Sequence, residues 1–349
     1  MTLASAVAAP SVLDYPIRTP PAAGEAMVVA PGILWLRMPL PFALDHINLW
    51  LLEDGDGWTI IDCGLGNELT RGHWQQVFDR YLAGKPVRRI ICTHCHPDHA
   101  GNADWLTRRF RAGFWMAQGE YMTAHALSDE QAGFDFEAIN EMFRRNGLSG
   151  EQLAKMRERR GGYRKGVPEF PRSYHRLLEG MTITIGGRAW RIIMGYGHSP
   201  EHAALYCDEL QLLVSGDMVL PRISTNVSVA VTDPQGNPLK LFLDSLERYL
   251  ELPAATLILP SHGLPFRGLH RRIGQLQEHH RLRLGELLAV CDAPRAAVDV
   301  LSTLFRRDLD AHQLSFAMGE AMAHLHFLQY HGDLARQVGT DGIIRFMRA

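Results

Sequence analysis

The amino-acid sequence predicts an α/β protein, a layered αββα sandwich with a helical lid insertion and a C-terminal helical appendage. Up to about residue 268, short runs of β-branched and aromatic residues bounded by Gly, Pro and Asp alternate with segments of helical periodicity. Residues 118–178 contain helix-like segments only, and residues 269–349 contain three longer ones before a final hairpin. The 349 residues, 46% of them hydrophobic, suffice for one large core and a smaller one.

The first part of the sandwich is predicted to be a strand meander followed by strand–helix–strand units. Residues 1–26 are rich in proline and are expected to form an irregular arm, which places the main domain at 27–268. The sequence predicts strands at 33–36, 47–52, 58–62, 87–92 and 113–117, and helices at 68–83 and 97–110. Because strands and helices alternate after residue 62, this part of the sheet should be parallel and buried.

The lid insertion is expected over residues 118–178, as short helices at 119–127, 135–146 and 149–160 that end near glycines. Its aromatic residues Phe136, Phe143 and Tyr163 either line an apolar substrate channel or pack the insertion itself. Its second half has eight basic residues against three acids: Lys155, Arg157, Arg159, Arg160, Arg164, Lys165, Arg172 and Arg176 against Glu151, Glu158 and Glu169. These charges either form a solvated face or attract an anionic substrate.

Two hairpins, a helix and a last buried strand are predicted to complete the sandwich. The hairpins cover 182–193 and 203–214, with turns at Gly186-Gly187 and Asp208-Glu209. Asn237-Pro238 is typical of a helix start, and this helix should run to about residue 252 before a strand at 256–259. The loops that follow these strands carry His198, Asp217 and His262, and they should meet at one edge of the sandwich.

The C-terminal domain, residues 269–349, is predicted to contain helices at 270–291, 295–305 and 312–331, followed by a hairpin over 335–346. Three helices and a hairpin in this order resemble a winged-helix module. Nucleic-acid-binding modules of this kind have a basic recognition helix, whereas residues 312–331 contain neither Lys nor Arg. The appendage is therefore interpreted as a packing or dimerisation element, compatible with a homodimer, and nucleic acid is not the expected partner.

The strongest chemical signal is the segment 93–102, which places His94, His96, Asp98 and His99 within six residues. A buried strand precedes it, and Pro97 suits the first turn of a helix that brings Asp98 and His99 back toward the other two. Imidazole and carboxylate ligands suit zinc and related metals, and four such ligands exceed what one catalytic metal needs. The segment therefore predicts a site for two metal ions.

This block, followed by His198, Asp217 and His262, resembles the metallo-β-lactamase fold superfamily over about residues 27–268. The resemblance implies the αββα fold, and it implies that Asp217 bridges two metals. One metal would be held by His94, His96 and His198, and the other by Asp98, His99 and His262. A metal-bridging hydroxide would be the nucleophile, and Asp98 would orient it and shuttle its proton. Asp62 and His202 would support the metal ligands from behind.

The resemblance implies a metal-dependent hydrolase that cleaves an ester-like bond, with thioesters of the glyoxalase II or acyl-carrier type first and lactones next. Arg222, Ser224 and Asn226 follow Asp217 and either reach the substrate or satisfy their own turn. A phosphodiesterase or ribonuclease of the same fold, and a mononuclear iron enzyme of the persulfide dioxygenase type, stay open as alternatives. Zinc is the first choice of metal, with manganese or iron as alternatives.

Composition sets the remaining expectations. A formal charge of −2 gives no reason to expect nucleic acid or an anionic membrane as partner. The resemblance implies a small acyl substrate instead, and the basic residues of the insertion would suit an anionic one. No apolar run is long enough to span a bilayer. Five cysteines without a scaffold pattern favour a reducing cytoplasm. Cys92 and Cys95 have CxxC spacing, but without a second such pair they are expected to be buried and structural.

Overall fold

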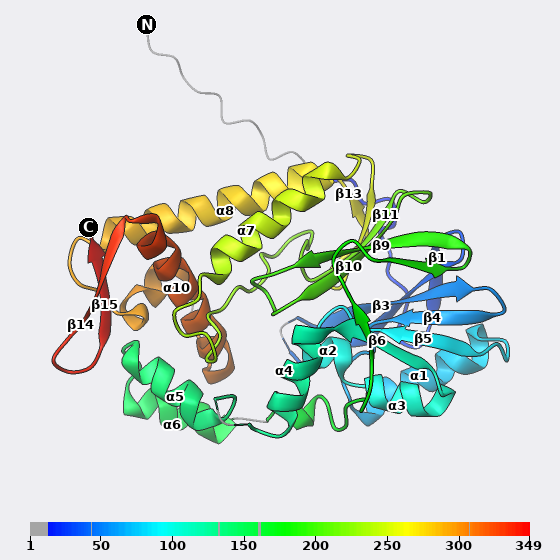
Figure 1. The fold of residues 1–349 in the computed structure, drawn as a ribbon, viewed down its shortest axis with the longest axis horizontal. Helices are drawn as coiled ribbons and strands as arrows, with labels where there is room; N and C mark the ends of the chain where they lie inside the picture. The colour runs from blue at the N-terminus through cyan, green and yellow to red at the C-terminus, as the bar shows by residue number, and fades with distance from the viewer. Residues whose placement is uncertain (1–12, 43, 132, 160–161, 307) are drawn as a thin grey trace, which may run out of the picture.

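The computed structural model describes residues 13–42, 44–131, 133–159, 162–306 and 308–349. Two β-sheets face each other and helices cover both outer faces, which confirms the αββα sandwich (Figure 1). Residues 1–12 of the expected N-terminal arm lie outside the described part of the chain. The rest of the arm is tied to the sandwich, since the carbonyl of Asp14 accepts a hydrogen bond from the Arg267 N–H at 2.8 Å.

The seven-stranded sheet keeps the order of the sequence. Its strands are β1 (Ala26–Ala30), β2 (Ile33–Pro39), β3 (His46–Asp54), β4 (Gly57–Ile61), β5 (Val87–Ile91), β6 (Gly113–Ala117) and β7 (His175–Leu177). The first four are antiparallel, and β4 to β7 pair in parallel. Helices α1 (Glu68–Tyr81), α2 (Pro97–Ala100) and α3 (Ala103–Phe110) form the crossovers that parallel strands require.

The six-stranded sheet has the order β13-β12-β11-β10-β9-β8. Its strands are β8 (Thr182–Ile185), β9 (Arg188–Gly195), β10 (His202–Cys207), β11 (Leu212–Gly216), β12 (Leu257–Pro260) and β13 (Phe266–Arg267). Only β11 and β12 pair in parallel, because α7 (Pro238–Arg248) lies between them in the chain. The Asn237 side chain caps this helix by accepting from the Lys240 N–H, as its sequence indicates.

Three hydrophobic clusters hold these layers together. Trp50 and Trp190 are fully buried between the two sheets. Trp74 of α1 packs on the outer face of the first sheet, and Phe242 of α7 packs on the outer face of the second. Burying each of these side chains contributes about 2–3 kcal/mol to the stability of the sandwich.

The C-terminal region follows the predicted order of helices and hairpin. It contains α8 (Leu269–Val290), a 3-10 turn at Ala297–Val300, α9 (Leu301–Leu304), α10 (Ala311–His331), β14 (Leu334–Val338) and β15 (Ile344–Arg348). Its apolar residues join the same cluster as α7, so this region continues the core of the second sheet. In the described part of the chain, no helix is both long and apolar enough to cross a membrane.

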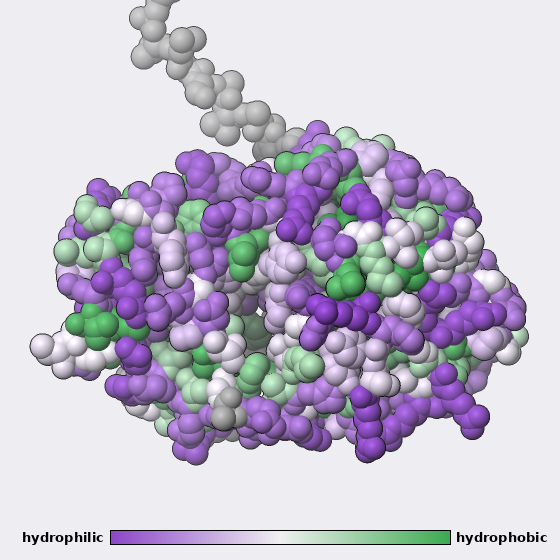
Figure 2. Space-filling model, viewed as in Figure 1, coloured by the Kyte–Doolittle hydropathy of each residue, from purple (hydrophilic) through white to green (hydrophobic). Residues whose placement is uncertain are grey.

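The insertion packs on the C-terminal region. Helices α5 (Phe136–Arg145) and α6 (Gly150–Arg159) lie beneath α10 in Figure 1, whereas α4 (Gln118–Ser128) stays with the first sheet. Phe143 is only 3% exposed and belongs to the hydrophobic cluster that also contains residues of α10, which favours packing over lining a channel. The surface in Figure 2 is mostly hydrophilic and is hollowed near its centre, between the parts that hold α10 and α4.

Four local features differ from the sequence prediction. The strands β1 and β13 were not expected, and β7 joins the first sheet from within the range assigned to the insertion. The single helix expected at 97–110 is broken at Gly101 and Asn102. The break is explained by the turn after β4, because the Asn102 amide donates to the Leu65 carbonyl at 2.8 Å.

Candidate metal centre

Seven potential metal ligands lie together at one edge of the sandwich. His94 and His96 follow β5, and Asp98 and His99 belong to α2. The other three lie beyond the ends of β9, β11 and β12, and they are His198, Asp217 and His262. They form two groups, and in each group the candidate ligand atoms lie within 4.8 Å of one another. The structure therefore brings together all the ligands that the sequence predicted.

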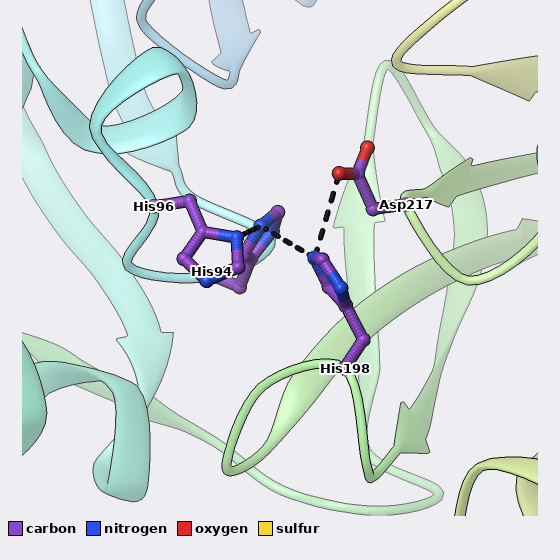
Figure 3. A group of neighbouring side chains, drawn as sticks. All are labelled: His94, His96, His198 and Asp217. Atoms are coloured by element: carbon purple, nitrogen blue, oxygen red, sulfur yellow. Dashed lines mark hydrogen bonds and ion pairs between the residues drawn. The ribbon is translucent and has the colours of Figure 1, made fainter. Parts of the chain in front are cut away.

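The first group consists of His94, His96, His198 and Asp217, whose side chains converge from three loops (Figure 3). The His94 Nε2 atom lies 2.9 Å from the His96 Nδ1 atom and 3.2 Å from the His198 Nε2 atom. The Asp217 Oδ2 atom lies 3.4 Å from the His198 Nε2 atom. Three imidazoles and one carboxylate thus face a single point.

The second group consists of Asp98, His99 and His262, and Asp217 also faces it. The Asp98 Oδ2 atom lies 3.7 Å from the His99 Nε2 atom and 3.5 Å from the His262 Nε2 atom. The Asp217 Oδ1 atom lies 3.6 Å and 3.4 Å from the same two nitrogens. Asp217 therefore presents one oxygen to each group.

Hydrogen bonds behind the site fix the tautomers of three histidines. The Nδ1 atom of His198 donates to the Asn226 carbonyl at 2.8 Å, and that of His262 donates to the His46 carbonyl at 2.8 Å. The Nδ1 atom of His99 lies 2.8 Å from the Asp62 carboxylate. Because Nδ1 carries the proton in each neutral ring, each Nε2 atom presents a lone pair to the interior of the site.

The interior of the site is suited to cations. The His99 Nε2 and Asp217 Oδ1 atoms are buried and have no hydrogen-bond partner among the described residues. Lone pairs and carboxylate oxygens that face one another repel unless a positive charge lies between them. Divalent metals accept imidazole nitrogen and carboxylate oxygen together, so the residues present fit two metal ions.

The pKa values of the site histidines shift for the same electrostatic reason. Burial and the neighbouring imidazoles lower the pKa values of His94 and His96 well below the usual range. Burial alone would lower the pKa of His99, but the carboxylates of Asp62, Asp98 and Asp217 raise it to about 10. The second group thus attracts positive charge, as a proton or as a metal ion.

Asp62 and His202 contact residues of the two ligand groups without belonging to either group, as the sequence analysis expected. The Asp62 carboxylate also accepts from the backbone N–H of Thr93 at 2.8 Å, and Asp62 has a positive φ of 60°. A non-glycine residue in this conformation indicates local strain held by its surroundings. The His202 Nε2 atom accepts from the Asp217 N–H at 3.1 Å, and burial lowers the pKa of His202 to about 3, so the ring stays neutral.

Two buried residues that hold the metal-site loops were not predicted from the sequence. The Glu120 carboxylate accepts from the Cys95 N–H at 2.9 Å and from the Glu201 N–H at 2.7 Å, which ties the loop of His96 to the loop of His198. The Asn48 amide donates to the carbonyls of Pro260 and Gly263, on both sides of His262. Each contacts the backbone of a distant segment, so no spacing in the sequence reveals it.

The three residues that were expected to bind the substrate lie in surroundings that differ from one another. Arg222 is exposed, and Ser224 lines a cleft against the C-terminal region. Asn226 supports His198, and its amide donates to Glu320 at 3.3 Å.

The aromatic residues of the insertion also differ in their surroundings. The Tyr163 hydroxyl donates to the Cys95 carbonyl at 2.5 Å, and burial raises the pKa of this hydroxyl well above its usual value. Phe136 is half-buried and lies under the Arg157 guanidinium, 5.9 Å from the ring centre. Tyr163 is therefore the one of the three aromatic residues that contacts a metal-site loop.

The basic residues of the insertion have acidic neighbours. Lys155 pairs with Glu151, Arg157 with Glu137, and Arg164 with Asp129, all on the surface. Exposed ion pairs of this kind contribute about 0–1 kcal/mol each, and each of these three acids offsets the charge of one basic residue. Arg160 lies outside the described residues. The described pairs favour a solvated face over an anion-attracting one.

Known proteins resemble both parts of the chain. The family model of the metallo-beta-lactamase superfamily matches residues 43–262, and the model of the metallo-beta-lactamase-like C-terminal domain matches residues 284–349. A crystal structure of a beta-lactamase domain protein from Burkholderia ambifaria is 50% identical in sequence. Its TM-score is 0.90, and the match covers 97% of this chain and 98% of that one.

Two relatives have more specific names. The "Probable metallo-hydrolase YqjP" of Bacillus subtilis is 25% identical over 304 residues, which are 85% of this chain and 92% of the relative. The "Atrochrysone carboxyl ACP thioesterase AacuM" of Aspergillus aculeatus is 22% identical over 234 residues, which are 66% of this chain and 55% of the relative. The family models, the shared fold and the ordered set of histidines and aspartates agree: the chain belongs to the metallo-β-lactamase superfamily, as a metallo-hydrolase-like member with candidate ligands for divalent metal.

Proposed function

We propose that the protein is a binuclear metal-dependent hydrolase that cleaves an ester-like bond, a thioester first and a lactone next. The observation that carries this proposal is the position of Asp217, whose two carboxylate oxygens face two separate groups of ligands. The similarity to a metallo-hydrolase and to an acyl-carrier thioesterase supports the hydrolytic reaction and the acyl substrate.

In this proposal His94, His96 and His198 hold one ion, and Asp98, His99 and His262 hold the other. Zinc is the first choice, with manganese or iron as alternatives. When bound, two such ions supply Lewis-acid activation of a carbonyl oxygen and a water molecule whose pKa is lowered toward about 7.

The protein's own residues contribute position and proton transfer. The Asp98 side chain is 18% exposed, more than those of the three ligand residues His99, Asp217 and His262 around it, so solvent and substrate can reach its carboxylate. We infer that Asp98 orients the attacking water molecule and holds its proton until the leaving group departs. The hydrogen bonds that three imidazoles donate to Asn226, His46 and Asp62 keep these rings in one tautomer, so no ring has to rearrange during the reaction.

The test is hydrolysis of four substrates by the purified protein: S-lactoylglutathione, a medium-chain acyl-CoA, an acyl-homoserine lactone and bis(p-nitrophenyl) phosphate. The proposal predicts turnover of a thioester or of the lactone, and at least a hundredfold loss of kcat in Asp98→Asn. Cleavage of the phosphodiester alone would replace the proposal with the phosphodiesterase function. Oxygen consumption with glutathione persulfide, and no hydrolysis of any of the four, would replace it with the iron-dependent one.

A further inference from the structure

A cleft of about 380 Å³ lies between the C-terminal region and the loop that follows Asp217. We call it the arginine cleft, and its lining includes Ser224, His279, Arg283, Phe305, Arg306 and Glu320. A second hollow of about 270 Å³ shares His279, Arg283 and Arg306 with it, so these side chains separate two adjoining spaces. This volume is in the range of small-molecule sites.

The inner wall of the cleft belongs to the same loop that supports the metal centre. Ser224 is followed by Thr225, whose hydroxyl donates to the Asp217 carbonyl, and then by Asn226, whose carbonyl accepts from His198. Glu320 reaches this loop from α10 through its hydrogen bond with the Asn226 amide. The loop 224–226 therefore contacts the metal-site residues Asp217 and His198 and also lines the cleft.

The cleft has an excess of positive charge. The guanidinium groups of Arg283 and Arg306 share a single carboxylate, that of Glu286, at 2.7 Å and 3.2 Å. Burial raises the pKa of Glu320 to about 7, so near neutral pH this second carboxyl group is only partly ionised. The two arginines carry two positive charges, and only one fully ionised carboxylate lies beside them. Part of the positive charge and some of the guanidinium N–H groups are therefore available to a bound anion.

Arginine suits this task because its planar guanidinium group binds carboxylate and phosphate with two parallel hydrogen bonds. Ser224 adds a hydroxyl group that can donate to the same anion. By contrast, Lys155, Arg157 and Arg164 of the insertion each have an acid of their own. Arg283 and Arg306 differ from these three residues because they share one acid between them.

We propose that the arginine cleft binds an anionic oxyacid group, a phosphate or a carboxylate, of the acyl substrate, with Arg283 and Arg306 as the main contacts. This proposal rests on the proposed hydrolase function and narrows its substrate to an anionic thioester or ester. The anion belongs either to the thiol side of the bond, as in coenzyme A, or to the acyl side, as in a dicarboxylic half-thioester.

Three thioesters distinguish these two sources when they are assayed with the full-length, metal-loaded protein. Butyryl-CoA carries phosphates on the thiol side, glutaryl-N-acetylcysteamine carries a carboxylate on the acyl side, and butyryl-N-acetylcysteamine carries no anion. We expect kcat/KM for one anionic thioester to exceed that for the neutral one at least tenfold, mainly through KM. The preferred substrate identifies the source of the anion.

The variants test whether the arginines cause this preference. In the double variant Arg283→Gln/Arg306→Gln, the ratio of kcat/KM between the anionic and the neutral thioester should fall at least tenfold. The double variant Arg283→Lys/Arg306→Lys keeps the charge and should restore part of the ratio, which a merely misfolded protein would not. Arg281→Gln is the matched control, because Arg281 is exposed on the same helix and pairs with Glu278 outside the cleft.

Calorimetric titration with pyrophosphate and with glutarate gives a readout that does not need turnover. The wild type should bind one of them at least tenfold more tightly than the glutamine double variant does. Equal hydrolysis of all three thioesters would leave the hydrolase function intact and overturn the cleft assignment. No hydrolysis of any thioester would instead overturn the thioester part of the proposed function, and the titration would then decide the cleft by itself: equal binding by both proteins would overturn it.

Discussion

Glu120 shows how much of the metal centre depends on a residue that is no ligand. Its carboxylate is fully buried and accepts two backbone N–H groups, one from each of two metal-site loops. Hydrogen bonds to a charged acceptor contribute about 1.5–3 kcal/mol each, and a buried donor left without a partner costs a further amount. Glu120 is therefore expected to position His96 and His198 through their backbones.

Glu120→Ala should lower the stability by about 3 kcal/mol and weaken metal binding, because both loops lose their common acceptor. Glu120→Gln keeps one acceptor oxygen and should restore part of both. The measurement is denaturant unfolding together with metal content after dialysis. Glu141→Ala removes an exposed carboxylate from α5 and serves as the control. Full metal content in Glu120→Ala would show that the two loops hold their positions without it.

At the scale of residues, the sequence predicts the ligands better than their supports. The ligands share a short spacing, as in 94–99, or lie directly after buried strands, as Asp217 and His262 do. Asp62 is predictable because it ends a strand. Glu120 and Asn48 act on backbone atoms of segments that only the fold brings near them, so their residue types and spacings are ordinary.

Gly101 is the point where α2 and α3 meet the turn after β4. A Cβ atom at this position would lie 2.3 Å from the Gly66 nitrogen and 2.4 Å from the Gly166 carbonyl oxygen. Backbone atoms cannot move aside as a flexible side chain does. Gly101→Ala should therefore lower the free energy of unfolding by about 1–3 kcal/mol and displace the segment that carries Asp98 and His99.

The matched control for Gly101→Ala is Gly72→Ala, within α1. A Cβ atom there meets no other atom within 4 Å, and alanine is the better helix former, so this variant should be as stable as the wild type or gain up to about 1 kcal/mol. Thermal and denaturant unfolding of both variants measure the difference. Equal stability of the two would contradict the close backbone packing at Gly101.

Two buried histidines join α8 and α10. The His280 Nδ1 atom lies 3.1 Å from the His324 Nε2 atom, and the His324 Nδ1 atom donates to the Glu320 carbonyl. Burial and the neighbouring imidazoles lower the pKa of His280 to about 3. Burial, with further contributions from His279 and Arg283, lowers that of His324 to about 4. Both rings are therefore neutral in the folded protein at pH 7.

The sign of the pH effect follows from these values. In the unfolded chain both residues have a pKa near 6.5, so below that pH the unfolded state binds protons that the folded state rejects. Stability is retained above pH 6.5 and is lost as the pH falls toward 4 and 3. Between pH 7 and pH 5 each histidine should cost about 2 kcal/mol.

The double variant His280→Leu/His324→Leu should show a smaller loss of stability between pH 7 and pH 5 than the wild type. Replacing both partners leaves neither imidazole unpaired. Denaturant unfolding at the two pH values gives the difference, and His331→Gln, an exposed change on the same helix, should behave like the wild type. An unchanged pH dependence in the double variant would show that these rings are not the groups that titrate.

At the scale of elements, hydrophobic periodicity predicts the long strands and helices. It does not predict features whose structure depends on tertiary contacts. The two-residue β13 is too short for any pattern, and the break at Gly101 depends on backbone atoms distant in sequence. The insertion was predicted as helices, but its aromatic residues alone could not tell packing from a channel. Phe143 is buried in a hydrophobic cluster that also contains residues of α10, more than 160 residues later in the chain.

At the scale of the whole molecule, the C-terminal region is connected to the metal centre by packing and by hydrogen bonds. The cores of the second sheet, the insertion and the C-terminal helices form one hydrophobic cluster, and Glu320 continues this link to the loop of His198. The sequence predicts both parts and their order. It does not predict that Arg283 of α8 and Arg306, just after α9, share the carboxylate of Glu286, because the sequence shows charges but not their partners.

We propose that Asp217 joins two metal ions in one hydrolytic site. This proposal is tested most directly by the metal content, measured by elemental analysis, of the wild type and of Asp217→Asn after purification without added metal. We expect two equivalents of divalent metal per chain in the wild type and at most one in the variant, because the shared carboxylate is lost. A single iron per chain in the wild type, or two equivalents in both proteins, would contradict it.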